Sequence, residues 1–399
     1  MATLKIRVFT NPDRLKHIAN VHLINLLAPW REYFADRGVE IPTNREDEFP
    51  HDKLAEALMS YDENMPIDLM NGLYFIDETA SNETLDDLIQ RAKDESIEIE
   101  SHGKSTAADV AVQIWIAKPE LLEERHTKTI ALQKQAFVYF PGQQRSGRDL
   151  PDLSADKLAE MAKLMDPFFE ERQRGRGTRI FAYPRPDEKK VFLLVRHGMP
   201  MTREGKHEED GEPGVAFYRP QKHDVLIYDA AIDVLGINAQ SKGEKTLYQE
   251  VLGEKIFGKK SYFGEGDIFT LAPIRNDGPK IQECGDIDGI DQVRLLEVVR
   301  VILGDVTRID IQKSSDLFRA LGENWGAVFT FGRITSAKFG FVFEGSAKQR
   351  SVTIRLDSAR YDRDSDAEFV EAWLRDKNFY APPQEEDVID EDDKSVASS

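Results

Sequence analysis

The first third of the chain has apolar residues at helical spacing. After a short strand expected at residues 4–10, Asn11 suits a helix cap, and Pro12 suits the first helical position, where no amide donor is needed. Apolar residues then recur every three or four positions, and the same spacing returns in later segments such as 83–93. Residues 107–117 are apolar on nearly every side, which is typical of a buried helix or strand. This part of the chain is therefore predicted to be mostly helical.

After residue 178 the period of apolar positions shifts towards two. Val352, Ile354 and Leu356 alternate with polar residues, as a half-exposed strand requires. Strands are predicted at residues 179–183, 191–195, 215–218, 224–228, 292–299, 308–311, 327–331, 339–343 and 350–356. Helices are predicted at residues 155–169, 243–257 and 314–322, and from a capping box at Ser365 and Glu368 onwards.

The order of these elements defines the fold class. We expect an α+β protein: a mostly helical N-terminal domain followed by an antiparallel β-rich domain with a few helices. Gly, Pro, Arg and Ser cluster between Pro141 and Ser154, which indicates a linker. The predicted domains are therefore residues 1–149 and 150–382. Residues 383–399 form an acidic tail that we expect to be disordered.

Charge and cysteine content narrow the class of protein. The chain has 53 basic and 72 acidic residues, a net charge of −19. The tail holds seven acids and one lysine, so it contributes −6 and leaves −13 on the rest. This balance argues against broad electrostatic binding to DNA or anionic lipid. A single cysteine, Cys284, suits a reducing cytoplasm, and no stretch reaches the roughly 20 apolar residues of a membrane span. We expect a cytoplasmic protein without membrane contact.

One motif suggests phosphoester chemistry. The apolar strand candidate before residue 196 ends in Arg196-His197-Gly198, which resembles the opening motif of the histidine phosphatase family. The resemblance implies that His197 is the nucleophile and that Arg196 binds phosphate. The alternative is a strand that leaves a sheet into a polar loop. The later histidines, His207 and His223, follow too soon to supply that family's second catalytic histidine.

Two further segments suggest nucleic acid. Phe339, Phe341 and Phe343 follow Lys338 in a strand that resembles the aromatic strand of RNA-recognition-motif domains. That resemblance implies stacking of the phenylalanines on bases. The alternative is that these phenylalanines, which share one face, belong to the core.

A glycine-rich basic stretch is the second such segment. Arg172, Arg174, Arg176 and Arg179 are interleaved with glycines, which suits a phosphate backbone. A solvated loop that balances neighbouring acids is the alternative.

Together these observations favour binding over catalysis. We expect a non-catalytic binding or regulatory module, an accessory subunit of a larger cytoplasmic assembly with a protein partner. Association with nucleic acid, in regulation or defence, would use the basic stretch and the phenylalanine strand. The alternatives are a phosphoester hydrolase that uses the Arg196-His197-Gly198 motif, and a structural scaffold. We expect no cofactor and no metal, since the histidines and the cysteine show no ligand spacing.

Overall fold

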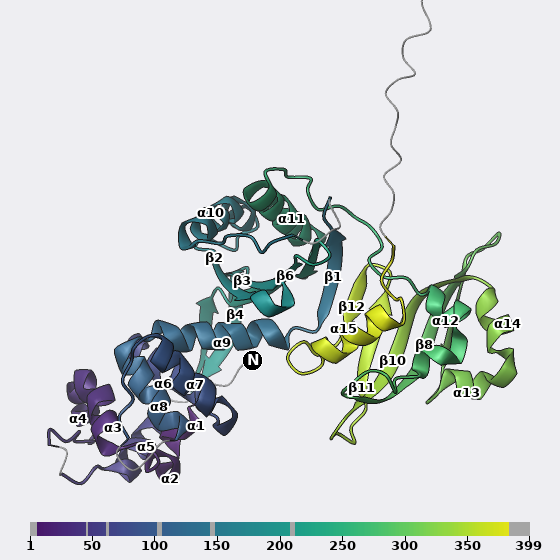
Figure 1. Ribbon diagram of the computed structural model, residues 1–399. Helices are drawn as coiled ribbons and strands as arrows, with labels where there is room; N and C mark the ends of the chain where they lie inside the picture. Colours follow the sequence, from purple (N-terminus) through teal and green to yellow (C-terminus); the bar gives the residue numbers. More distant parts are fainter. Residues whose placement is uncertain are drawn as a thin grey trace, which may run out of the picture. The chain divides into compact units, whose positions relative to one another are not determined.

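The chain consists of two compact units. A computed structural model describes residues 6–44, 47–60, 64–101, 106–143, 148–207 and 212–382 (Figure 1). The first unit is Met1–Ile130 and the second is Ala131–Ser399. The division therefore comes earlier than the boundary expected after residue 149, since residues 136–141 pair with strands of the second unit. The expected disorder of the tail concerns residues 383–399, which lie outside the described residues.

The first unit is built from helices around one apolar core. Asn11 caps α2 as expected, since its side chain accepts a hydrogen bond from the Asp13 N–H at 2.9 Å. The expected strand at 4–10 is wrong, because Arg7–Thr10 is a short helix. The helices are α1 (Arg7–Thr10), α2 (Pro12–Leu15), α3 (Asn20–Leu27), α4 (Arg31–Asp36), α5 (His51–Met59), α6 (Ile67–Thr79), α7 (Leu85–Asp94), α8 (Ala107–Ala117) and α9 (Glu120–Gln133).

A buried carboxylate holds part of this core together. Residues 107–117 form the buried helix α8, and its Asp109 is fully buried. The carboxylate accepts hydrogen bonds from the Ala19 N–H at 2.8 Å and the Gln113 amide at 3.0 Å, and it lies 2.8 Å from Nδ1 of His22. A buried carboxylate needs such partners, and through Ala19 and His22 Asp109 connects α8 to the start of α3.

The second unit contains a ten-stranded antiparallel sheet. Its strand order is β2-β3-β6-β7-β1-β12-β11-β10-β8-β9, and β4 and β5 form a separate hairpin. The strands are β1 (Ala136–Pro141), β2 (Arg179–Arg185), β3 (Lys190–Gly198), β4 (Thr202–His207), β5 (Pro213–Tyr218), β6 (Gln221–Asp229), β7 (Val234–Asn238), β8 (Ile290–Ile302), β9 (Arg308–Lys313), β10 (Arg333–Phe343), β11 (Arg350–Arg355) and β12 (Ser358–Arg360).

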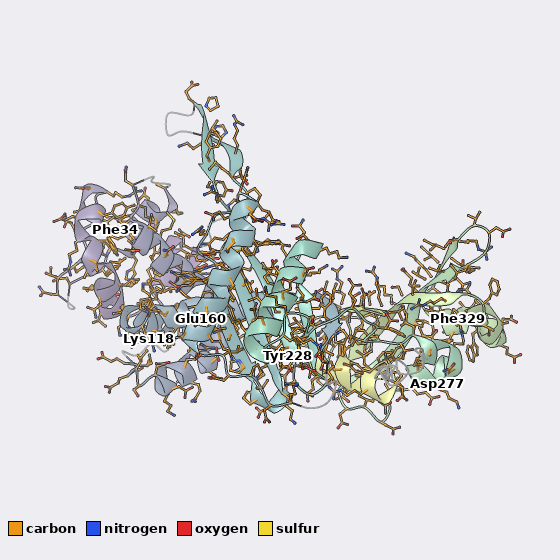
Figure 2. The ribbon with its side chains drawn as sticks, turned by 90° about the horizontal axis from the view of Figure 1, so that it is seen from above. Phe34, Lys118, Glu160, Tyr228, Asp277 and Phe329 are labelled. Atoms are coloured by element: carbon orange, nitrogen blue, oxygen red, sulfur yellow. The ribbon has the colours of Figure 1, made fainter. Side chains whose placement is uncertain are left out.

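Helices cover opposite faces of the two halves of this sheet. Neighbouring residues of β1 show this, because Phe140 packs in the core under α10 and α11 whereas Tyr139 packs with the core under α15. Figure 1 shows α12 and α15 in front of β8 and β10, and Figure 2 labels Tyr228 and Phe329, one from each core. The helices are α10 (Ala155–Glu171), α11 (Lys242–Phe257), α12 (Ala272–Asn276), α13 (Leu317–Leu321), α14 (Trp325–Thr330) and α15 (Ala367–Asp376).

The α+β class is confirmed, with one local correction. Residues 327–331 were expected as a strand, but Trp325–Thr330 form the helix α14. Arg275 donates to the carbonyl of Phe329 at 2.9 Å, and the buried Arg300 donates to that of Val328, so two arginines bind the free carbonyls of this short helix. Among the helices of the described residues, none is long and apolar enough to cross a membrane.

Candidate nucleic-acid interface

The His197 side chain is buried and is fully occupied by its neighbours. It is 3% exposed, and its ring stacks on Phe169 with 4.0 Å between centroids. Nε2 lies 3.0 Å from a carboxylate oxygen of Asp224, and Nδ1 lies 2.8 Å from the Gly198 carbonyl oxygen. A nucleophilic imidazole needs a lone pair that is open to substrate. Both ring nitrogens of His197 face acceptors inside the protein, so this geometry does not provide one.

Arg196 cannot act with His197 on one phosphate. The two residues are adjacent in β3, and successive side chains of a strand point to opposite faces of the sheet. The Arg196 guanidinium lies over the Phe181 ring, 5.2 Å from its centre. The site implied by the phosphatase-like motif is therefore not formed, because strand geometry separates its two members.

His197 belongs to a buried network of charges below α10 and α11. The Asp224 carboxylate accepts from the Tyr248 hydroxyl at 2.7 Å and from the Lys222 ammonium at 3.0 Å. Lys222 also donates to Glu244 at 2.9 Å, and Arg174 donates to the same Glu244 oxygen at 2.5 Å. Two cations thus neutralise two carboxylates inside the fold, which makes the burial of these charges tolerable.

Glu244 is the most strongly held acid of this network. It is the third residue of α11, where it forms a capping box with Ser241. Burial acts to raise the pKa of Glu244, but hydrogen bonds from the Ser241 N–H, Arg174 and Lys222 outweigh burial and lower the pKa to about 2. Glu244 is therefore a structural anion at neutral pH.

The same network could be mistaken for a metal site. Ligand atoms of His197, Asp224 and Glu244 all lie within 4.8 Å of one another. However, the Lys222 ammonium already lies within 3.0 Å of both carboxylates. A metal ion would have to displace this internal cation, so the residues present do not favour one.

A second buried polar cluster joins the two halves of the sheet. Lys190 of β3 pairs with Glu371 of α15, which also accepts from the Tyr361 hydroxyl at 3.0 Å. Arg363 lies over the Tyr361 ring at 3.9 Å and donates to the Tyr139 hydroxyl. Burial raises the pKa of Tyr361 well above its usual value. These groups satisfy one another, which indicates a structural cluster.

The predicted basic stretch is largely ion-paired. Arg172, Arg174 and Arg176 lie 3.5, 2.5 and 2.6 Å from carboxylate oxygens of glutamates. Arg179 at the start of β2 is exposed and has no acidic partner within the described residues. The alternative of a loop that balances nearby acids therefore describes three of the four arginines, and the stretch offers little free positive charge to phosphate.

The phenylalanine strand points into the core. Phe339 and Phe341 are fully buried and Phe343 is 5% exposed. The rings of Phe339 and Phe341 pack edge-on against Trp373 of α15, at 4.9 and 5.1 Å between centroids. The expectation that these rings stack on bases is wrong, because α15 covers them.

The other face of the same strands carries cations. Lys338 precedes Phe339, so its side chain leaves on the opposite side of the sheet. Lys338 pairs in register with Thr353 of β11, which in turn pairs with Arg360 of β12. Two residues before Lys338, Ser336 pairs with Arg355 of β11. Two residues after Lys338, Gly340 pairs with Arg294 of β8, the strand on the other flank of β10. We call Arg294, Lys338, Arg355 and Arg360 the basic face.

The four cations of the basic face have no acidic partner. Within the described residues, none of them makes an ion pair or a side-chain hydrogen bond. The one acid in the row of Lys338, Glu297, pairs with Lys313 at 3.0 Å. Strand spacing and residue rise place diagonal neighbours such as Lys338 and Arg355 about 8 Å apart at their Cα atoms. Positive charge without an acidic partner among the described residues thus gathers on this side of the sheet.

Towards the sheet edge this face becomes apolar. Val299 of β8 pairs with Ile311 of the edge strand β9, and both lie in the row of Ser336. Ile309 and Ile311 are 64% and 53% exposed. The basic face therefore borders an apolar strip on β9, and Lys313 of the same strand lies in the row of Lys338 and Glu297.

No protein-family model matches the chain, and no curated protein matches it in sequence. The sequence analysis missed the basic face because its members come from four strands. In the sequence, each of these cations alternates with an apolar residue, which indicates an exposed position on a strand. Only the register of the strands shows that the four cations share one surface.

Proposed function

We propose that the protein is a non-catalytic nucleic-acid-binding module whose basic face contacts the phosphate backbone. The observation that carries this proposal is the set of four unpaired cations on one open side of β8–β12. In a chain of net charge −19, unpaired cations gathered on one surface indicate an anionic partner.

The polar character of the centre favours nucleic acid over a protein. Protein interfaces are organised around buried apolar or aromatic anchors, whereas phosphate contacts come from Arg, Lys and hydroxyl side chains. Ser336, Ser351 and Thr353 stand among the four cations, and no aromatic side chain of β10 or β11 shares their face. The apolar residues lie at the border of the basic face.

The same argument limits the kind of recognition. Base stacking needs exposed aromatic rings, and the phenylalanines of β10 face the other way. We therefore expect binding to the backbone with little sequence preference, at non-specific affinities of about 10⁻⁴–10⁻⁶ M at physiological salt.

The test is fluorescence anisotropy with a labelled 20-base-pair DNA duplex, the matching RNA duplex and each single strand. A Lys338→Gln/Arg355→Gln variant should bind duplex about 60-fold more weakly at 0.1 M salt, since each lost phosphate contact removes the release of about 0.9 counterion. Arg172→Gln/Arg176→Gln is the matched control, because both arginines are already paired with glutamates. Equal weakening in both variants, or binding of poly-glutamate but of no nucleic acid, would refute the proposal.

The wider role stays a prediction. Membership of a larger cytoplasmic assembly, in regulation or defence, and a protein partner are expectations from the sequence. The exposed apolar residues of β9 support a protein partner, because an edge strand with such side chains is open to further pairing. A structural scaffold is the alternative that uses the same surfaces.

A further inference from the structure

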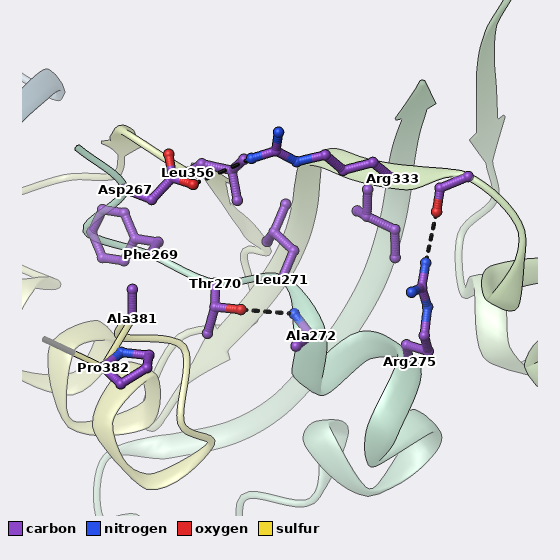
Figure 3. Close-up of a pocket in the computed structure, with 12 residues that line it drawn as sticks. Asp267, Phe269, Thr270, Leu271, Ala272, Arg275, Arg333, Leu356, Ala381 and Pro382 are labelled. Atoms are coloured by element: carbon purple, nitrogen blue, oxygen red, sulfur yellow. Dashed lines mark hydrogen bonds and ion pairs between the residues drawn. The ribbon is translucent and has the colours of Figure 1, made fainter. Parts of the chain in front are cut away.

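The described chain ends beside the end of β11, on the helix-covered side of the sheet. Figure 3 shows Pro382 and Ala381 at a pocket of about 530 Å³ that Leu356 also lines. The Ala381 N–H donates to the Ile268 carbonyl and the Ile268 N–H donates to the Leu356 carbonyl, both at 2.8 Å. Leu356 directly follows Arg355, a member of the basic face. Since neighbouring residues of an extended segment point to opposite faces, Leu356 and the pocket lie on the side opposite Arg355, and the tail would have to pass round the end of β11 to meet these cations.

The tail is long enough to cover the whole face. Its first acid, Glu385, is the third residue after Pro382, and its last, Asp393, is the eleventh. Extended chain spans at most about 3.3–3.6 Å per residue, so these acids can reach about 10 and 38 Å from Pro382. Arg294 and Arg355 lie two diagonal steps apart, about 17 Å.

The first part of the tail matches the order of side chains along one row of the sheet. Glu385–Asp387 are acidic, Val388 and Ile389 are apolar, and Asp390–Asp393 are acidic again. The sheet row that starts at Arg355 continues through Ser336 to the apolar pair Val299 and Ile311 of the edge strand β9. A cation and then apolar side chains thus follow one another along this row, as the first acids are followed by Val388 and Ile389 in the tail.

We propose that residues 385–393 bind the basic face of their own chain and compete there with nucleic acid. The competition rests on the proposed function, whereas the docking of the tail does not. An effective concentration of about 1 mM for a short tether, with a Kd of about 0.1 mM for the tail, lowers the affinity for nucleic acid about tenfold. High salt weakens both contacts, because both are ionic.

Carbodiimide cross-linking of the full-length protein tests the docking. The reagent joins a carboxylate to a lysine that touches it, and Lys338 is the lysine at the centre of the face. Mass spectrometry should find amide links from Lys338 to residues 385–393, at several-fold lower yield in an Arg355→Gln/Arg360→Gln variant. Lys280, which is more exposed than Lys338 but lies on the helix-covered side, is the internal control and should give few links.

A mixture of isotope-labelled and unlabelled chains identifies the source of the tail. Links within one chain support the proposal. Links only between chains, links to Lys280 as abundant as links to Lys338, or no links from Lys338 would overturn it.

Duplex binding separates this inference from the proposed function. A full-length variant with the seven tail acids changed to Asn or Gln should bind duplex about tenfold more tightly at low salt, and combining it with Lys338→Gln/Arg355→Gln should abolish the gain. Links to Lys338 without any duplex binding would leave the docking intact and refute the proposed function. Duplex binding that requires the basic face, without cross-links from Lys338 to the tail, would support the proposed function and refute the docking of the tail.

Discussion

Glu244 gives a stability prediction whose size follows from its contacts. Its side chain is fully buried, and it accepts from the Ser241 N–H at 2.7 Å, from Arg174 at 2.5 Å and from Lys222 at 2.9 Å. These donors prefer the ionised form and outweigh burial, so the pKa falls from the ordinary 4.5 to about 2. At about 1.4 kcal/mol for each pKa unit, this preference contributes about 3 kcal/mol to the free energy of unfolding.

The sign of the pH dependence follows from the lowered pKa. A group whose pKa is lower in the folded state stabilises the protein above its unfolded pKa and loses this effect as pH falls through the folded value. The contribution of Glu244 is therefore complete above about pH 5 and is lost between about pH 4.5 and 2.

The perturbation is Glu244→Gln, measured by urea denaturation with far-UV circular dichroism at several pH values. We expect the free energy of unfolding of the second unit to fall by about 3 kcal/mol at pH 7, and the gap to the parent to close towards pH 2. Glu265→Gln is the matched control, because Glu265 is 84% exposed and 3.9 Å from an exposed lysine. That control should stay within about 0.5 kcal/mol throughout. A gap that is absent at pH 7, or that stays constant with pH, would refute the reasoning.

Two further predictions concern packing and use thermal denaturation. Gly198→Ala should lower Tm by several degrees, because its new Cβ would lie 2.2 Å from the Arg174 carbonyl oxygen. Gly205→Ala is the control, because its Cβ meets open space, and it should lower Tm less than half as much. Equal shifts in Tm would contradict the packing around β3. Phe341→Ala should lower the free energy of unfolding by about 3–5 kcal/mol, yet leave the duplex affinity of the folded protein unchanged. A loss of duplex affinity without a loss of stability would support the base-stacking interpretation instead.

Alternation along β10 shows what the sequence could provide. The apolar period of two predicted the strand and placed Phe339, Phe341 and Phe343 on one face. The period does not say which face a helix covers. The answer depends on Trp373 of α15, a contact that forms only after the chain has folded back. The same segment therefore fits a base-stacking strand and a core strand until the partner is known.

The basic face and the His197 network could not be predicted from the sequence either, because both depend on contacts between segments far apart in the chain. Arg294 and Arg360 come onto one surface only through the register of four strands, and single-sequence patterns do not fix register between distant segments. Likewise, the Arg-His-Gly motif places Arg196 and His197 side by side in the chain. The pleat of β3 points their side chains to opposite faces of the sheet, and the His197 imidazole contacts Asp224 in the core.

The salt dependence of duplex affinity tests the central claim most directly. Anisotropy titrations from 50 to 200 mM salt should give the parent a slope of about −3.6 in log K against log salt, a loss of about 150-fold, if all four cations meet phosphates. Changing Arg294, Lys338, Arg355 and Arg360 together to Gln should bring the slope close to zero. A variant slope equal to the parent slope would show that phosphate is bound elsewhere and would contradict the account.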